Sequence, residues 1–142
     1  MAISLRKIGK TFVAELDGID LSGTLDVEAV EEIRQAWWDH SVLVVRNQNI
    51  SEEQHIAFSH NFGNLQEHTV KDWLLPAHPE ILVLSNRGRG GVKPLDNGGA
   101  YWHSDMTYAA APPMGSILHA LTVPPEGGDT LYADMYAAYE AL

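Results

Sequence analysis

The alternation of hydrophobic and polar positions predicts a hairpin followed by a helix at the start of the chain. Residues 3–16 contain two short apolar stretches on either side of Gly9 and Lys10, which predicts two strands joined by a turn. A helix is predicted from a cap at Asp26 to about His40. Its apolar positions recur at helical spacing: Val27, Val30, Ile33 and Trp37.

Further short elements are predicted along the rest of the chain. The continuous apolar run at residues 42–45 is typical of a buried strand. Ser51 and Gln54 have the spacing of a capping box, which predicts a second helix that Gly63 ends. Asp134 is predicted to cap a helix that begins at Met135. Four more strands are predicted at residues 81–84, 101–108, 116–123 and 129–132.

The predicted strands do not complete a closed β architecture. About six or seven short strands are fewer than the roughly eight of a barrel or a double-sheet roll. An unfinished sheet leaves unpaired edges, so we expect such a fragment to associate, and a homo-oligomer is one arrangement that the sequence leaves open. We therefore expect residues 1–142 to be the N-terminal half of a single larger domain.

Composition places the chain among ordinary globular proteins and excludes some chemistry. Of the 142 residues, 45% are hydrophobic and 20% are charged. The sequence contains no cysteine, which excludes disulfides, thiolate metal sites and cysteine nucleophiles. No apolar run approaches the ~20 residues that span a bilayer, and the first residues lack a long apolar stretch. We therefore expect no membrane partner and a cytoplasmic location.

The net charge bears on possible partners. A formal charge of -10 repels nucleic acid, so we expect no nucleic-acid partner. The densest basic group comprises Arg87, Arg89 and Lys93. We interpret it as part of a solvated loop, and binding of a small anionic ligand is the alternative.

The strongest chemical candidate is the sequence Trp102-His103-Ser104-Asp105. On a strand His103 and Asp105 would share a face, with Cβ atoms ~7 Å apart, so that both could reach one metal ion. One imidazole and one carboxylate are two of the three ligands in the 2-His-1-carboxylate site of non-haem Fe(II) oxygenases. The alternative is an exposed histidine and aspartate on a strand, since His-x-Asp alone also arises by chance.

The sequence around this pair resembles the taurine/2,4-dichlorophenoxyacetate dioxygenase family of Fe(II)- and 2-oxoglutarate-dependent enzymes. In that family a W-H-[ST]-D motif carries the first two iron ligands and a P-P-x-G-G-D-T motif follows; residues 102–105 and 124–130 match them. Other segments match in the same order, so the resemblance covers nearly the whole chain: residues 41–46, 54–58, 62–63, 112–113, 115–118 and 137–142.

The resemblance implies a fold and a set of site residues. The fold is mainly β with flanking helices, a double-stranded β-helix (jelly roll), which would be incomplete in this chain. His103 and Asp105 would ligate iron, and Thr130 would hydrogen-bond a carboxylate of 2-oxoglutarate. The family's second histidine ligand and its 2-oxoglutarate arginine come later and have no counterpart here. His119 precedes that position, so it is not expected to be the third ligand.

Substrate-binding residues follow from the same resemblance. His68 comes shortly after Phe62-Gly63, where the taurine enzyme has a histidine that contacts the sulfonate; a surface-loop histidine is the alternative. Lys71 stands near a tyrosine position of that enzyme, so the pocket departs from the taurine pocket. Asn97 would take the part of the family's substrate-binding asparagine; its spacing to His103 is longer here, and its Asn-Gly-Gly setting suits a turn equally well.

The implied activity is that of an oxidoreductase. Fe(II) is the metal cofactor, and 2-oxoglutarate and O2 are the cosubstrates. The substrate would be a small anionic organic acid of sulfonate or aryloxyalkanoate type, hydroxylated with release of succinate and CO2. Two alternatives stay open: a truncated fragment without catalytic activity, and a cupin-like module that binds a metal without oxygen chemistry. We expect the fragment alone to be inactive.

Overall fold

The computed structural model describes residues 3–95 and 98–142, so the predicted substrate residue Asn97 lies outside the described residues. The chain divides into two compact units. One combines the first 49 residues with His119–Leu142, and the other is Ile50–Leu118. Each unit is described by itself below.

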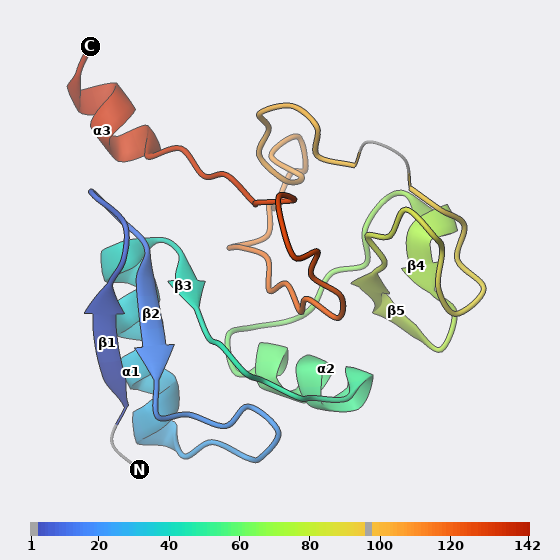
Figure 1. Ribbon diagram of the computed structural model, residues 1–142, viewed down its shortest axis with the longest axis horizontal. Helices are drawn as coiled ribbons and strands as arrows, with labels where there is room; N and C mark the ends of the chain where they lie inside the picture. Colours follow the sequence, from blue (N-terminus) through green and yellow to red (C-terminus); the bar gives the residue numbers. More distant parts are fainter. Residues whose placement is uncertain (1–2, 96–97) are drawn as a thin grey trace. The chain divides into compact units, whose positions relative to one another are not determined.

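The first unit contains a three-stranded sheet in the order β1-β2-β3 (Figure 1). β1 (Ser4–Lys7) pairs antiparallel with β2 (Ala14–Asp17), which confirms the predicted hairpin. β2 also pairs in parallel with β3 (Leu43–Val44), a shorter strand than the predicted residues 42–45. The helix α1 (Val27–His40) connects β2 to β3, since parallel neighbours need a crossover of this kind.

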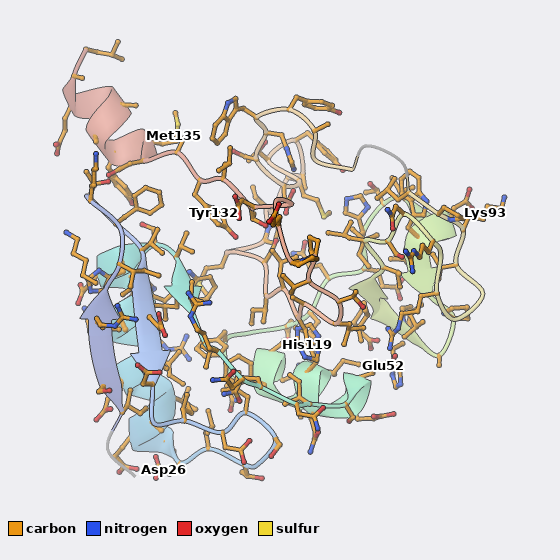
Figure 2. The ribbon with its side chains drawn as sticks, viewed as in Figure 1. Asp26, Glu52, Lys93, His119, Tyr132 and Met135 are labelled. Atoms are coloured by element: carbon orange, nitrogen blue, oxygen red, sulfur yellow. The ribbon has the colours of Figure 1, made fainter. Side chains whose placement is uncertain are left out.

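The predicted helix over residues 27–40 is confirmed as α1. The Oδ1 atom of Asp26, at its start in Figure 2, accepts a hydrogen bond of 2.8 Å from the amide of Ala29. Two of the four predicted apolar positions are buried, Val30 and Ile33, whereas Val27 in the first turn is exposed. The buried apolar side chains of this unit include Val30, Ile33 and Ala36 of α1 and Ala14 and Leu16 of β2.

The second unit begins with α2 (Glu52–His60) and its capping box. The amide of Gln54 donates to the Ser51 hydroxyl at 3.2 Å, and the amide of Ser51 donates to the Gln54 side chain at 2.8 Å. The capping box is therefore confirmed. The helix ends at His60 rather than at Gly63, because the amides of Asn61 and Phe62 turn back to carbonyls three residues earlier. Gly63 closes the turn that follows, with a φ of 146°.

A small hairpin forms the core of the second unit. The 3-10 turn at Lys71–Trp73 leads into β4 (Leu74–Leu75), which pairs antiparallel with β5 (His78–Leu82). The predicted strand at residues 81–84 is thus displaced toward the N-terminus. Val83 lies just beyond β5 and belongs to a buried cluster with Leu75 and Val92. Trp73 and Ile81 pack against this cluster.

The strands predicted after residue 100 are wrong. Residues 98–142, all described, contain no strand, and residues 105–108 form turns. Apolar side chains in these segments are exposed, among them Trp102 at 68%, Val123 at 71% and Leu131 at 71%. An alternating apolar pattern forms a strand only where a neighbouring strand pairs its amides and carbonyls. No described strand does so here.

The last helix agrees with its sequence signal. The Oδ1 atom of Asp134 accepts a hydrogen bond of 3.0 Å from the amide of Ala137, and α3 (Met135–Glu140) begins at Met135 (Figure 2). The predicted cap is therefore confirmed. Among the helices of the described residues, none is long and apolar enough to cross a membrane.

Candidate functional site

The structure brings the side chains of His103 and Asp105 together. The Nε2 atom of His103 lies 3.2 Å from the Oδ1 atom of Asp105, and both side chains are about half exposed. The approach does not come from the alternation of a strand, because residues 102–104 have no regular secondary structure. Residues 105–108 are turns, and Met106 has a left-handed φ of 48°.

A backbone contact determines which nitrogen of His103 faces Asp105. The Nδ1 atom lies 2.8 Å from the carbonyl oxygen of Tyr101. A carbonyl only accepts, so Nδ1 carries the proton and donates it. In the neutral imidazole the Nε2 atom then has its lone pair free toward the carboxylate. Histidines that ligate metals hold their other ring nitrogen in this way, against a carbonyl or a carboxylate.

The donor set of this pair fits a divalent transition metal. A lone pair on Nε2 and a carboxylate oxygen repel each other unless a proton or a cation lies between them. Two ligands about 2.1 Å from one ion and at right angles to each other are about 3.0 Å apart. The observed 3.2 Å is close to that separation. Imidazole nitrogen with carboxylate oxygen is also the ligand combination of non-haem Fe(II) sites.

Ser116 is a partner of this pair to which the sequence assigned no role. Its hydroxyl donates a hydrogen bond of 3.0 Å to the Oδ2 atom of Asp105, which leaves Oδ1 for His103. The two residues are 11 positions apart. In the sequence, Ser116 was marked only by the match of residues 115–118 to the family. That match does not say which residue Ser116 contacts.

The pair has no third ligand within the described part of the chain. Across residues 3–95 and 98–142 no three His, Cys, Asp or Glu side chains form a group that could hold an ion. His119 is the first residue of the second segment of the other unit, His119–Leu142. The described residues therefore provide one imidazole and one carboxylate at this place.

His68 lies on a segment that is tied to the chain just beyond Asp105. The Thr69 hydroxyl is 3.0 Å from the Tyr108 hydroxyl, and the Gln66 side chain donates to the Ala111 carbonyl at 3.4 Å. The Nδ1 atom of His68 accepts from the amide of Val70 at 3.1 Å. In the neutral ring the proton is therefore on Nε2, which can donate to an anion.

Thr130 and Lys71 have no recorded contact with the His103–Asp105 pair. Thr130 is exposed and belongs to the unit that contains residues 119–142, whereas His103 and Asp105 belong to the other. Lys71 forms an ion pair of 2.6 Å with Glu67, four residues earlier in the chain.

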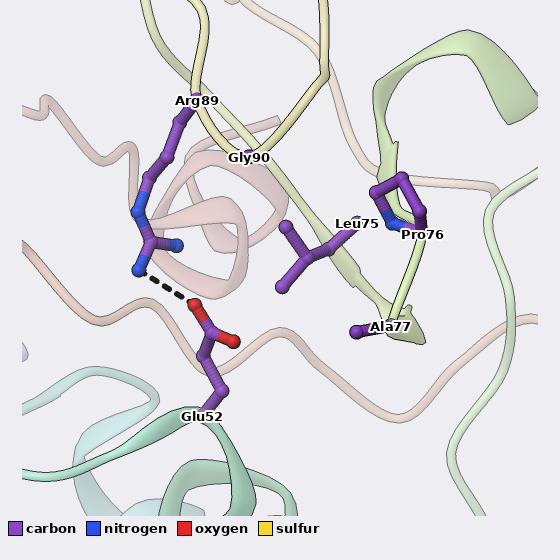
Figure 3. Close-up of a pocket in the computed structure, with 6 residues that line it drawn as sticks. All are labelled: Glu52, Leu75, Pro76, Ala77, Arg89 and Gly90. Atoms are coloured by element: carbon purple, nitrogen blue, oxygen red, sulfur yellow. Dashed lines mark hydrogen bonds and ion pairs between the residues drawn. The ribbon is translucent and has the colours of Figure 1, made fainter.

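A pocket of about 380 Å3 in the second unit lies apart from the candidate residues. It is lined by Glu52, Leu75, Pro76, Ala77, Arg89 and Gly90 (Figure 3). Arg89 forms an ion pair of 2.6 Å with Glu52, so this member of the basic group is neutralised by the protein itself. Arg87 and Lys93 are exposed, as expected for a solvated loop. Gly90 has a left-handed φ of 57°, a backbone conformation that favours glycine.

Comparisons with known proteins give the family. Residues 4–142 match the family described as "Taurine catabolism dioxygenase TauD, TfdA family". The chain is 35% identical over 153 residues to the alpha-ketoglutarate-dependent 2,4-dichlorophenoxyacetate dioxygenase of Cupriavidus pinatubonensis, covering 100% of this chain and 53% of that protein. It is 34% identical over 133 residues to the alpha-ketoglutarate-dependent sulfate ester dioxygenase of Pseudomonas putida, covering 91% of this chain and 40% of that protein.

A solved structure agrees with these relatives. The crystal structure of a taurine dioxygenase from Burkholderia xenovorans aligns with a TM-score of 0.82 and 37% identity, over 99% of this chain and 48% of that chain. The chain spans about half the length of the curated relatives it matches. Because the family match extends over residues 4–142, the chain belongs to the TauD/TfdA family of dioxygenases.

Proposed function

We propose that the protein is an Fe(II)- and 2-oxoglutarate-dependent dioxygenase that hydroxylates a small organic acid of sulfonate or aryloxyalkanoate type. The observation that carries the proposal is the 3.2 Å approach of His103 Nε2 to Asp105 Oδ1, with the Nδ1 proton held by a carbonyl. Membership of the TauD/TfdA family supports the same chemistry.

In this proposal the residues of the chain bind and orient. His103 and Asp105 hold the iron through Nε2 and Oδ1. The Thr130 hydroxyl donates to a carboxylate of 2-oxoglutarate, and the His68 Nε2–H donates to the acid group of the substrate. With iron and 2-oxoglutarate bound, O2 would be the oxidant: one of its oxygen atoms would enter the substrate C–H bond and the other would enter succinate, with release of CO2. Asn97, by its likeness to the family's asparagine, would be a second residue that binds the substrate.

The names of the relatives support the substrate class at a coarse level. One acts on 2,4-dichlorophenoxyacetate, another on (S)-phenoxypropionate, and a third on sulfate esters. A fourth, pentalenolactone F synthase of Streptomyces avermitilis, is 36% identical and is named for neither class. Hydroxylation next to the ether or ester oxygen gives an unstable product that cleaves, so one site chemistry serves both aryloxy acids and sulfate esters.

We further propose that residues 1–142 form the N-terminal half of one jelly-roll dioxygenase domain. The curated relatives are about twice as long, and in this proposal the described residues contribute only His103 and Asp105 as metal ligands. The second histidine and the arginine for 2-oxoglutarate are then provided from outside these residues. A protein truncated after Leu142 is expected to show no 2-oxoglutarate turnover. Robust turnover by a monomer of this length would refute this part of the proposal.

The activity is tested by measuring succinate formation with the full-length protein across a panel of sulfonates, sulfate esters and aryloxyalkanoic acids. At least one substrate is expected to stimulate succinate release well above the rate with 2-oxoglutarate alone. The His103→Ala variant is expected to lose this stimulation. Stimulation that survives in His103→Ala would remove His103 from the site, and a panel without any active acid would contradict the substrate class.

A further inference from the structure

A chain of hydrogen bonds connects helix α2 to the candidate metal ligands within the second unit. The Nε2 atom of His55, on α2, lies 3.1 Å from the carbonyl oxygen of Ile117. Since the carbonyl only accepts, the imidazole donates. This contact joins residues 62 positions apart and anchors the segment that contains Ser116. That segment is otherwise without regular structure.

The anchored segment presents its next side chain to Asp105. The Ser116 hydroxyl donates to Oδ2 of Asp105 at 3.0 Å, and the other oxygen, Oδ1, faces His103. A carboxylate on a turn rotates freely about its side-chain bonds unless one oxygen is held. A hydrogen bond to one oxygen therefore selects the orientation in which the second oxygen points to the imidazole.

We infer that Ser116 is a positioning residue for the metal ligand Asp105, with the His55–Ile117 contact holding Ser116 in place. The inference rests on the proposed function, in which Asp105 ligates iron. Hydrogen-bond partners of this kind orient metal ligands, and their loss costs about 10- to 100-fold in metal affinity or activity. Ser116 acts only through Asp105, so its effect must appear in metal binding itself, before any substrate or 2-oxoglutarate is present.

The test is a titration of the full-length, metal-free protein with Co2+, followed by its visible d–d absorption. The Ser116→Ala variant is expected to bind Co2+ about tenfold more weakly, with a changed band shape, because the carboxylate no longer has one orientation. Ser116→Thr keeps the hydroxyl and is expected to retain the affinity and spectrum of the unaltered protein. Ser104→Ala is the matched control, because the Ser104 hydroxyl makes no hydrogen bond to another described residue.

The outcomes separate this inference from the proposed function. If Ser116→Ala binds Co2+ with unchanged affinity and spectrum while His103→Ala loses binding, the role of Ser116 is overturned and the metal site stands. If His103→Ala also binds Co2+ like the unaltered protein, both the metal site and the role of Ser116 are overturned. Far-UV circular dichroism and thermal unfolding of Ser116→Ala establish that the exposed substitution leaves the fold intact.

Discussion

The imidazole of His103 faces the carboxylate of Asp105 across 3.2 Å while its opposite nitrogen donates to the Tyr101 carbonyl. This arrangement lets Nε2 and Oδ1 reach one and the same cation. A metal that binds only the folded state adds to the free energy of unfolding in proportion to the logarithm of its concentration.

A divalent metal is therefore expected to stabilise the full-length protein against heat. With Mn2+ at about 100 times its dissociation constant, the gain is about 2.7 kcal/mol. His103→Ala is expected to lose this gain, and chelation of the metal is expected to reverse it. The measurement is thermal unfolding with and without Mn2+. An equal rise in melting temperature for the unaltered protein and His103→Ala would place the stabilising ion elsewhere.

Thr130→Val is expected to weaken the binding of 2-oxoglutarate. The change keeps the shape of the side chain and removes the hydroxyl, at a cost of about 1.5–3 kcal/mol for a hydrogen bond to a charged group. The apparent affinity for 2-oxoglutarate is expected to fall by roughly one to two decades. Thr122→Val, an exposed threonine in the same unit, serves as control. An unchanged dependence of turnover on 2-oxoglutarate would remove Thr130 from the site.

His68→Leu is expected to raise the KM for the acidic substrate without changing the dependence on 2-oxoglutarate. The Val70 amide donates a hydrogen bond to Nδ1 of His68, so the proton of the neutral ring is on Nε2. His68→Leu removes this Nε2–H donor. A donor to an anion contributes about 1.5–3 kcal/mol, so the KM should rise by roughly one to two decades. His68→Gln keeps a donor and should recover part of the effect. Equal KM values for His68→Leu and for His60→Leu, an exposed control on α2, would identify His68 as a surface histidine.

Glu15→Gln is expected to destabilise the first unit. The carboxylate is buried, accepts a hydrogen bond of 2.8 Å from Arg6 and forms an ion pair of 3.2 Å with Arg46. The loss of hydrogen bonds between charged groups at a buried site should cost about 2 kcal/mol in free energy of unfolding. Glu31→Gln is the matched control, because Glu31 pairs with Arg34 on the surface of α1, where such a pair contributes about 0.5 kcal/mol or less. Similar losses in denaturant unfolding of the two variants would contradict this account.

The start of α2 is expected to give a pH-dependent contribution to stability. The Ser51 hydroxyl, 2.7 Å from Glu53, lowers the pKa of that carboxyl below its ordinary value of 4.5, and a backbone hydrogen bond and the charge of His78 act in the same direction. Because the folded pKa is the lower one, the contribution is present above about pH 4.5 and is lost as the pH falls through the folded pKa.

Glu53→Gln should therefore lower the melting temperature at pH 7, and this difference from the unaltered protein should shrink as the pH falls below 4.5. A difference of constant size across that range would show that Glu53 acts through packing and not through its charge.

The sequence by itself determined the local structure and the family. The caps at Asp26, Ser51 and Asp134 were predictable because each depends only on residues within one helical turn. The hairpin of β1 and β2 was predictable because its strands lie close together in the chain. The W-H-S-D and P-P-E-G-G-D-T segments carried the family, since a motif match needs no knowledge of contacts.

Only the tertiary structure decided how the candidate ligands meet. A strand over residues 101–108 was the wrong basis for pairing His103 with Asp105, because none of these residues is in a strand and residues 105–108 form turns. The contacts of Ser116 with Asp105 and of His55 with Ile117 join residues 11 and 62 positions apart. A local pattern does not contain such contacts, because they exist only when distant segments pack together and satisfy each other's hydrogen bonds.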